Sequence, residues 1–488
     1  MKKIYTILIA AVFLSSCAKN LEEYNVDQKK ANEVPAATLF TAAQKSFADV
    51  ITSPSVNTNV FRFYVQYWTT TEYLDEPRYN LLSRTLPQAF WSAIYKDVLI
   101  DLKDAKRLVT ADATLTDDVR ANRLGEIEVM EVLAWSTLVN TFGNIPYSEA
   151  LDVANVQPKY DDAATIYSDL LVRLDAALAK FKPAAAGFGT ADLLYGSSAT
   201  GVAQWVKFGN SLKLRMGLTL VDKDAATAKT TIEAAAPNVF ASAADNARFP
   251  YTSISPNNNP ISTAANAALT SRKDYIGAKP FIDKLNELAD PRRAGFFTTV
   301  GGAYIGGFYG FPNSYANYST MSTRVAALDF EALLMDYPET EFALAEAASR
   351  GFVVPGTAEQ HYNNAVTASV VYWGGTTAQA ATYLARPDVA FTIASADYKE
   401  SIGIQKWIAL YNRGYDSWIE WRRLDFPKLL PPSNATAPPG ESVSIALNIP
   451  VRLIYPINEQ TLNKGKRDEA ASAIGGDLVT TKIFWDVN

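Results

Sequence analysis

Thiols and imidazoles are almost absent from this chain, which has one cysteine, Cys17, and one histidine, His361, in 488 residues. A lone cysteine cannot close a disulfide within the chain or build a site of several thiolates. One histidine excludes the two-histidine zinc motifs, and no Gly-x-Ser-x-Gly elbow accompanies it for a serine triad. Because His361 lies in the helical-looking stretch EQHYNNAV, we interpret it as structural.

An excess of positive charge is also absent. The formal net charge is −6, and loss of residues 1–16 would remove Lys2 and Lys3 but no acid, which leaves −8. Such an acidic body argues against nucleic acid or an anionic lipid surface as the main partner.

Two further patterns are missing from the chain. The alternation of apolar and polar residues that marks strands is not sustained anywhere, which excludes a sandwich or a doubly wound sheet. The glycine pairs at 301–302 and 306–307 lack the Gly-x-x-x-x-Gly-Lys-Ser/Thr pattern of a phosphate-binding loop. We therefore expect no phosphate site there, and no cofactor, metal or catalytic residue is predicted.

The N-terminus has the pattern of a secretory signal peptide. Lys2 and Lys3 precede an apolar run at 4–14, which is shorter than the roughly 20 residues that a helix needs to cross a bilayer. Leu14-Ser15-Ser16-Cys17 resembles the bacterial lipobox, so we predict a signal peptide at 1–16 and lipid attachment at Cys17. The alternative is a secreted protein whose cysteine is incidental.

A polar stretch without apolar periodicity follows Cys17. We interpret 17–34 as the lipidated N-terminus and a tether that lifts the folded part off the membrane. The acidic pair Glu22-Glu23 resembles the short signal that sends some outer-membrane lipoproteins to the cell surface. These features predict an outer-membrane, lipid-anchored and surface-exposed protein.

Apolar residues recur at helical spacing through most of the remaining chain. The stripes predict helices at about 35–50, 87–109, 124–142, 163–181, 201–220, 324–350, 358–373 and 398–424. Antiparallel pairs of such helices indicate tetratricopeptide-like hairpins, although no strict period of about 34 residues is visible. The stretch 248–323 has the composition of a long loop. With no linker dividing the chain, we expect one all-α domain at 35–488.

Five motifs, taken in order along the chain, resemble the SusD/RagB family of outer-membrane nutrient-binding lipoproteins. They are FGNIPYSEA at 142–150, WVKFGNSLKLR at 205–215, EAASRG ending at 351, QKWIALYNRGYDSWIEWRRLDFP at 405–427 and IPVRLIYPINEQTLN at 449–463. One departure is Leu424-Asp425, where relatives often carry Thr-Gly. The resemblance implies a helical scaffold with long ligand-binding loops, no catalysis, and a SusC-like TonB-dependent transporter as partner.

Some of these motif residues have two readings. Trp205, at the start of the second motif, belongs to a helical stripe. This position favours packing in the core over contact with a ligand. Arg422 and Arg423 lie near Glu420 and Asp425, which favours a hydrogen-bonded clamp between helices over an anion site.

Two loop segments carry aromatic residues beside amides and carboxylates. Such loops offer flat faces for stacking and polar groups for hydroxyls or backbone, as a sugar or peptide surface requires. The alternative is that the rings point inward and hold the loops against the helices. The candidate ligand-binding residues are Trp68, Tyr73, Tyr79, Tyr304, Tyr309, Tyr315 and Tyr318.

The leading hypothesis is a lipoprotein that binds an oligosaccharide or peptide nutrient and delivers it to the transporter. A surface glycoside hydrolase is one alternative, because 51 acidic residues leave paired carboxylates possible in principle. A purely structural lipoprotein whose helical-repeat face binds other proteins is the other.

Overall fold

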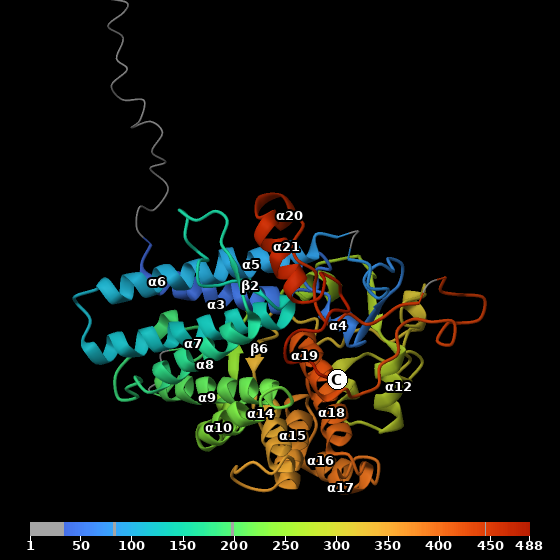
Figure 1. Ribbon diagram of the computed structural model, residues 1–488. Helices are drawn as coiled ribbons and strands as arrows, with labels where there is room; N and C mark the ends of the chain where they lie inside the picture. The colour runs from blue at the N-terminus through green and yellow to red at the C-terminus, as the bar shows by residue number, and fades with distance from the viewer. Residues whose placement is uncertain (1–33, 82–83, 197–199, 445) are drawn as a thin grey trace, which may run out of the picture. The chain divides into compact units, whose positions relative to one another are not determined.

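Most of the regular structure in this chain is helical, as Figure 1 shows for the computed structural model. The structure describes residues 34–81, 84–196, 200–444 and 446–488. Cys17, the predicted signal peptide and residues 17–33 of the predicted tether lie outside the described residues. The contacts group Ala36–Asn488 into one compact unit.

The longer helices and the strands follow one another from the first helix to the last. The helices of eight or more residues are α3 (Ala36–Thr52), α5 (Leu86–Ile94), α6 (Ile100–Ala111), α7 (Asp117–Phe142), α8 (Ala163–Leu178), α9 (Gly201–Leu220), α10 (Ala225–Ala235), α12 (Lys279–Glu287), α14 (Tyr337–Ser349), α15 (Ala358–Tyr372), α16 (Thr377–Leu384), α18 (Tyr398–Ala409), α19 (Gly414–Leu424) and α21 (Lys464–Ala473). The short helices are α4 (Phe61–Tyr64), α11 (Ser262–Ala265), α13 (Arg293–Phe296), α17 (Phe391–Ala394) and α20 (Glu459–Leu462).

Six short strands form three antiparallel pairs. These are β1 (Trp68–Thr70) with β5 (Tyr275–Gly277), β2 (Ile145–Pro146) with β3 (Tyr160–Asp161), and β4 (Ala247–Phe249) with β6 (Ala332–Met335). The β2–β3 pair lies within the connection between α7 and α8, whereas the other two pairs join segments that are distant in sequence and so tie separate parts of a helical protein together.

Helices adjacent in sequence pack against each other. The packed pairs include α6 with α7, α7 with α8, α9 with α10, α14 with α15 and α18 with α19. In Figure 1, α6 to α10 occupy the left of the view, and long loops with α12 occupy the right. The predicted all-α fold with tetratricopeptide-like hairpins is confirmed.

Local sequence explains where several helices begin and end. The Thr116 side chain accepts a hydrogen bond from the Val119 amide at the start of α7, and Gly143 ends that helix at a φ of +81°. Thr357 and Gln360 form a reciprocal capping box at the start of α15. Such caps satisfy backbone groups that a helix end leaves without partners.

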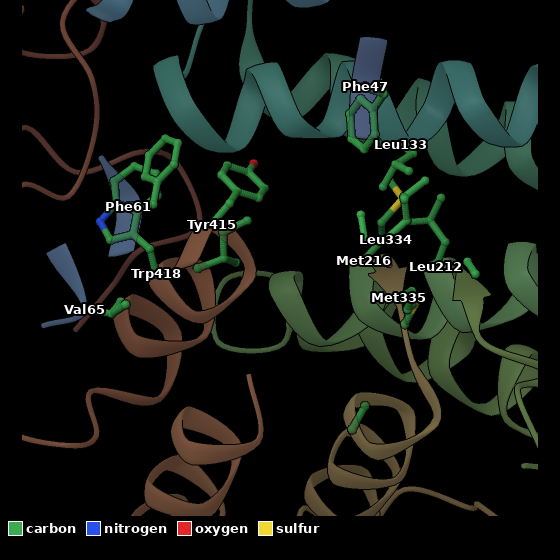
Figure 2. Close-up of a cluster of buried hydrophobic side chains, with 14 of the residues drawn as sticks. Phe47, Phe61, Val65, Leu133, Leu212, Met216, Leu334, Met335, Tyr415 and Trp418 are labelled. Atoms are coloured by element: carbon green, nitrogen blue, oxygen red, sulfur yellow. The ribbon is translucent and has the colours of Figure 1, made fainter. Parts of the chain in front are cut away.

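The core is a continuous set of buried apolar side chains. Figure 2 shows Phe61, Tyr415 and Trp418 as one group, where α4 meets α19; the Phe61 ring centroid lies 4.8 Å from that of Trp418. The second group in Figure 2 comes from several helices and β6, and it comprises Phe47, Leu133, Leu212, Met216, Leu334 and Met335. Trp205 is fully buried, which confirms core packing for that motif.

Buried ion pairs join the C-terminal helices to the rest of the core. Arg423 donates to Glu346 Oε1 at 2.5 Å and to Glu420 Oε2 at 2.6 Å. Arg422 donates to the carbonyls of Asn140 and Val451. The two arginines therefore join α19 to other parts of the chain, as predicted, and Glu420 takes part, but Asp425 pairs with Lys428 and with neither arginine.

Several predicted boundaries differ from the structure. The predicted helix at 324–350 is wrong in its first part, because Ala332–Met335 is strand β6, buried along its whole length and paired with β4. The predicted helix at 398–424 is broken between α18 and α19, where Asn412 has a φ of +72°. The predicted long loop at 248–323 contains α12. None of the described helices combines the length and apolar character needed to span a membrane.

Candidate ligand-binding site

The β1–β5 pair brings two loop segments together. Trp68 pairs with Gly277 and Thr70 with Tyr275. Beyond the strand, the Thr71 amide donates to the Asp274 carbonyl at 2.9 Å, and the Thr71 hydroxyl donates to the Lys273 carbonyl at 2.7 Å. The loop after β1 and the segment before β5 therefore leave the strand pair side by side.

Asn313 ties a third segment to the same strand. Its side-chain amide donates to the carbonyls of Thr70, Phe308 and Phe311, and its side-chain oxygen accepts from the Phe308 amide at 2.8 Å. Its own backbone amide donates to the Thr71 carbonyl. One side chain thus satisfies the backbone of a loop that has no regular structure of its own.

Two of the candidate rings lie at this junction. Tyr73 is 57% exposed and lies two residues beyond Thr71. Tyr315 is half-buried, and the Lys273 ammonium lies 5.7 Å from its ring centroid. The β1–β5 pair and Asn313 place these residues on neighbouring loop segments, and we use the name Tyr73–Tyr315 cluster for Tyr73, Lys273 and Tyr315 together. It presents aromatic faces and one cation on loops whose backbone is held in place.

Three other candidate rings are buried. Trp68 is 1% exposed, with the Arg62 guanidinium 4.9 Å from its ring centroid and its indole N–H donating to the Tyr411 hydroxyl at 3.2 Å. The Tyr309 hydroxyl donates to the Phe63 carbonyl at 2.6 Å, and the Tyr79 ring packs 6.3 Å from the Tyr309 ring. In this structure these rings hold the loops against the helices, and Tyr309 also lines the cavity of about 440 Å³ described below.

The last two candidates have different surroundings. The Tyr304 carbonyl accepts from the Asn286 side chain, and the Arg293 guanidinium lies 5.4 Å from the Tyr304 ring centroid. Tyr318 is half-buried, and the next residue, Ser319, donates its amide to the Ile305 carbonyl. The Tyr318 amide also donates to the Tyr315 carbonyl at 3.5 Å, whereas the contacts of Tyr304 are with Asn286 and Arg293.

A cavity of about 440 Å³ lies on the other side of the Phe308–Tyr309 segment. Its walls are largely apolar and include the half-buried Phe308 and the buried Trp407, with lysines among the lining residues. The size and the apolar walls suit a small ligand or one unit of a longer ligand. Residues of this cavity that the sequence did not single out are Gln66, Lys279, Pro280, Asp283, Lys284, Trp407, Pro427, Lys428, Leu429 and Leu430.

Gln66 shows why this cavity was missed. It is fully buried, has a φ of +57°, and donates its side-chain amide to the Leu430 carbonyl at 2.7 Å, 364 positions further along the chain. A non-glycine residue in this backbone region is uncommon and costs about 1–3 kcal/mol, so the surrounding structure must enforce it. No local sequence pattern announces a contact over such a separation.

The single histidine is engaged with neighbouring groups. His361 Nδ1 lies 2.8 Å from Glu341 Oε2, and its Nε2 contacts the Pro355 carbonyl oxygen, as expected of a structural histidine. Within the described ranges, no three His, Cys, Asp or Glu residues are grouped so that they could hold a metal ion.

Comparison with known proteins adds to this geometry. A family model for SusD-like proteins, described as "Starch-binding associating with outer membrane", matches residues 28–456. A search of curated proteins finds no match.

Several solved structures share the fold. A chitin-binding protein is 25% identical with a TM-score of 0.77, over 93% of this chain and 100% of that one. A Bacteroidetes SusD-like protein, AC2a, is 21% identical with a TM-score of 0.79, again over 93% and 100%. A chitin-binding SusD homolog from Flavobacterium johnsoniae is 23% identical with a TM-score of 0.76, over 92% and 99%. With its family motifs, its paired helices and a family match over most of its length, the chain belongs to the SusD-like family.

Proposed function

We propose that this protein is a non-catalytic, lipid-anchored protein of the outer membrane that binds an oligosaccharide through the Tyr73–Tyr315 cluster. The observation that carries the proposal is the exposed Tyr73 and the half-buried Tyr315 ring beside Lys273, on neighbouring loops that β1–β5 and Asn313 hold in place. Aromatic faces bind the apolar face of a sugar ring, and an ammonium group donates to its hydroxyls.

Two supports favour a sugar over a peptide. The family is described as starch-binding, and two of the similar structures are described as chitin-binding. The cavity beside Phe308 offers a further apolar surface of the size of one or two sugar units. Binding through a few rings gives modest affinity, because ordering the ligand offsets much of the gain, and this suits a protein that must release its cargo.

The proposed partner is a SusC-like TonB-dependent transporter, with Cys17 as the site of the lipid anchor. A Cys17→Ser variant should leave the membrane fraction, while the unchanged protein should remain there and co-purify with a transporter of this class. Membrane retention of Cys17→Ser would count against the anchor. Purification of the wild-type protein without a transporter would count against the partner.

The central experiment uses a soluble form that begins after Cys17. Maltooligosaccharides, chitooligosaccharides and oligopeptides are titrated in a calorimeter, and every mixture is analysed for breakdown products. We expect one glycan class to bind without cleavage. Breakdown products would contradict the non-catalytic role and favour a surface glycoside hydrolase. Absence of binding to every compound in the panel would favour a structural lipoprotein that binds other proteins.

Matched variants locate the site. Tyr73→Ala and Tyr315→Ala should each weaken glycan binding by roughly 3- to 10-fold, the equivalent of about 0.5–1.5 kcal/mol of aromatic contact. Both variants should unfold at the wild-type temperature, because neither ring is buried. Trp68→Ala is the contrasting variant, and we expect it to lose about 3–5 kcal/mol of stability through a core cavity. Unchanged affinity in both tyrosine variants would refute this site.

A further inference from the structure

Tyr304 lies at a groove that the proposed function does not use. The groove has a volume of about 580 Å³ and runs between the turn after α12 and the exposed side of α16. Two arginines, Arg293 and Arg386, line it together with Tyr304. Asp290 and Thr382 are also among its lining residues.

The end of α12 fixes the three groups relative to one another. The Asn286 side chain donates to the Tyr304 carbonyl at 2.9 Å and accepts from Arg293 Nη1 at 3.1 Å. Arg386 Nη2 donates to the carbonyl of the next residue, Glu287, at 3.3 Å. The backbone of Tyr304 and both guanidinium groups are therefore bonded to two consecutive residues, and the Tyr304 ring lies against Arg293.

The charges in the groove are unevenly compensated. Asp290 is fully buried and paired with Arg292 at 2.5 Å, and Arg386 is paired with Asp388 at 2.6 Å. Arg293 forms no ion pair with any described residue, and it covers one face of Tyr304 instead. A groove with an uncompensated cation is notable on a chain whose net charge is −6.

Hydrogen-bond donors also remain unused in the groove. Within the described part of the chain, Arg293 Nη2, Arg386 Nη1 and the Tyr304 hydroxyl donate to no protein group. Cations near a helix C-terminus are stabilised by the helix dipole, which accounts for the bond from Arg386 to the Glu287 carbonyl, while Arg293 donates to the Asn286 side chain and the Asp290 carbonyl. It does not account for the remaining donors, which all suit an acceptor-rich ligand.

We propose that this groove, which we call the Tyr304–Arg386 groove, is a second binding site, for an acidic sugar unit. The sugar ring packs against Tyr304, and its carboxylate accepts hydrogen bonds from Arg293 and Arg386. Guanidinium groups suit carboxylates because they present several donors in one plane. The inference shares with the proposed function the premise of a glycan ligand, but it uses none of the residues of the Tyr73–Tyr315 cluster.

The test compares α-1,4-linked tri-galacturonate with its fully methyl-esterified form, which keeps the sugar but removes the charge. Both are titrated in a calorimeter into the soluble form that begins after Cys17. We expect the acid to bind and the ester to bind at least about tenfold more weakly, since hydrogen bonds to charged groups are about twice as strong as neutral ones. Arg293→Gln and Tyr304→Ala should each weaken binding of the acid by about tenfold, and Tyr73→Ala should not change it.

Two further variants keep the test valid if Arg293→Gln fails to fold. Arg386→Gln alters an arginine whose side chain is 35% exposed, and Thr382→Trp fills the groove from the exposed side of α16. Both should fold and should weaken binding of the acid. Equal affinity for acid and ester, absence of binding, or a loss caused by Tyr73→Ala alone would each overturn the proposal.

The same variants separate this inference from the proposed function. Neutral maltotriose and chitotriose should respond to Tyr73→Ala and not to Thr382→Trp. If neutral glycans do not bind but tri-galacturonate binds with the expected response to the variants, the function proposed for the Tyr73–Tyr315 cluster is refuted. Binding of an acidic sugar at the Tyr304–Arg386 groove is then still supported.

Discussion

The helical pairs and the long loops of this protein achieve order in different ways. In α7 and α14, the helical hydrogen bonds and a capping side chain at the first turn, Thr116 and Asp336 respectively, satisfy the backbone within each helix. In the loops, single side chains satisfy it instead: the half-buried Asn313 serves the segment at 308–313, and the buried Asn259 donates its side-chain amide to the Phe330 carbonyl at 2.6 Å. Loops held in this way can present rings to a ligand with little further loss of conformational entropy on binding.

Among changes to the helical pairs, loss of the buried ion pairs that Arg423 forms with Glu346 and Glu420 should destabilise the protein most. Burial raises the pKa of Glu420, but Arg423 and Lys406 outweigh it and lower that pKa to about 2. Arg423→Ala would leave Glu346 and Glu420 buried with less compensation. We expect a loss of about 3–5 kcal/mol in the free energy of unfolding, measured by urea denaturation.

The control is Lys464→Ala, which removes an exposed partner of Asp468 and should cost less than about 1 kcal/mol. If Arg423→Ala lowers the free energy of unfolding no more than this control does, these ion pairs do not stabilise the packed helices.

Gly310 offers the corresponding test in the loops. Its φ is +77°, and a β-carbon there would lie 2.4 Å from Pro432 Cγ. Gly310→Ala should therefore combine backbone strain with a clash and cost about 1–3 kcal/mol. It should also speed proteolysis within 431–437, because Pro432 has to move.

Gly302→Ala is the matched control. Its φ is +85°, but a β-carbon there would meet open space. The control should show the strain alone and leave cleavage at 431–437 unchanged. Equal proteolysis of the two variants would show that the Gly310–Pro432 contact does not order this loop.

Removing the hydroxyl of a buried loop tyrosine should lower the free energy of unfolding slightly, whereas removing that of an exposed one should not. Tyr309→Phe removes a buried hydroxyl that donates to the Phe63 carbonyl, and we expect a loss of about 0.5–1.5 kcal/mol. Tyr73→Phe removes a hydroxyl from a ring that is 57% exposed and should leave the free energy of unfolding unchanged. Thermal and urea unfolding of the two variants measure the difference. Equal stability would mean that the Tyr309 hydrogen bond contributes nothing to loop order.

The sequence predicts the helical pairs more accurately than it predicts the segments between them. The range predicted for α9 agrees with the structure at both ends, because its stripe depends only on spacing within one helix. Strand β6 was predicted as helix, since ALLM has good helix formers and its partner β4 lies some 80 residues earlier. Local pattern cannot reveal such a partner.

The same limit applies to the candidate rings. The sequence marks Tyr73 and Tyr309 alike as aromatic residues in polar loops. What separates them is the hydrogen bond from Tyr309 to Phe63, 246 positions earlier in the chain, and the packing that it accompanies. Ring direction in a loop is therefore set by distant contacts, and the sequence alone leaves it open.

His361 gives the smallest predicted effect, and it concerns α14 and α15. Burial lowers the pKa of His361, but its contacts with Glu341 and the Pro355 carbonyl outweigh burial and raise that pKa above the usual 6.5. A raised pKa in the folded state means that the protonated ring stabilises the fold. This contribution is complete below about pH 6.5 and is lost as the pH rises through the folded-state value.

We therefore expect the free energy of unfolding of the wild-type protein to fall relative to that of His361→Gln as the pH rises from 5.5 to 8.5. Urea denaturation of both proteins across this range gives the difference, which cancels every other titrating group to first order. Glu341→Gln should flatten the same difference, because the ring then loses the carboxylate that favours its charged form. A difference that stays constant across the range, or rises with pH, would mean that the imidazole is neutral in the folded state and that this contact is an uncharged hydrogen bond.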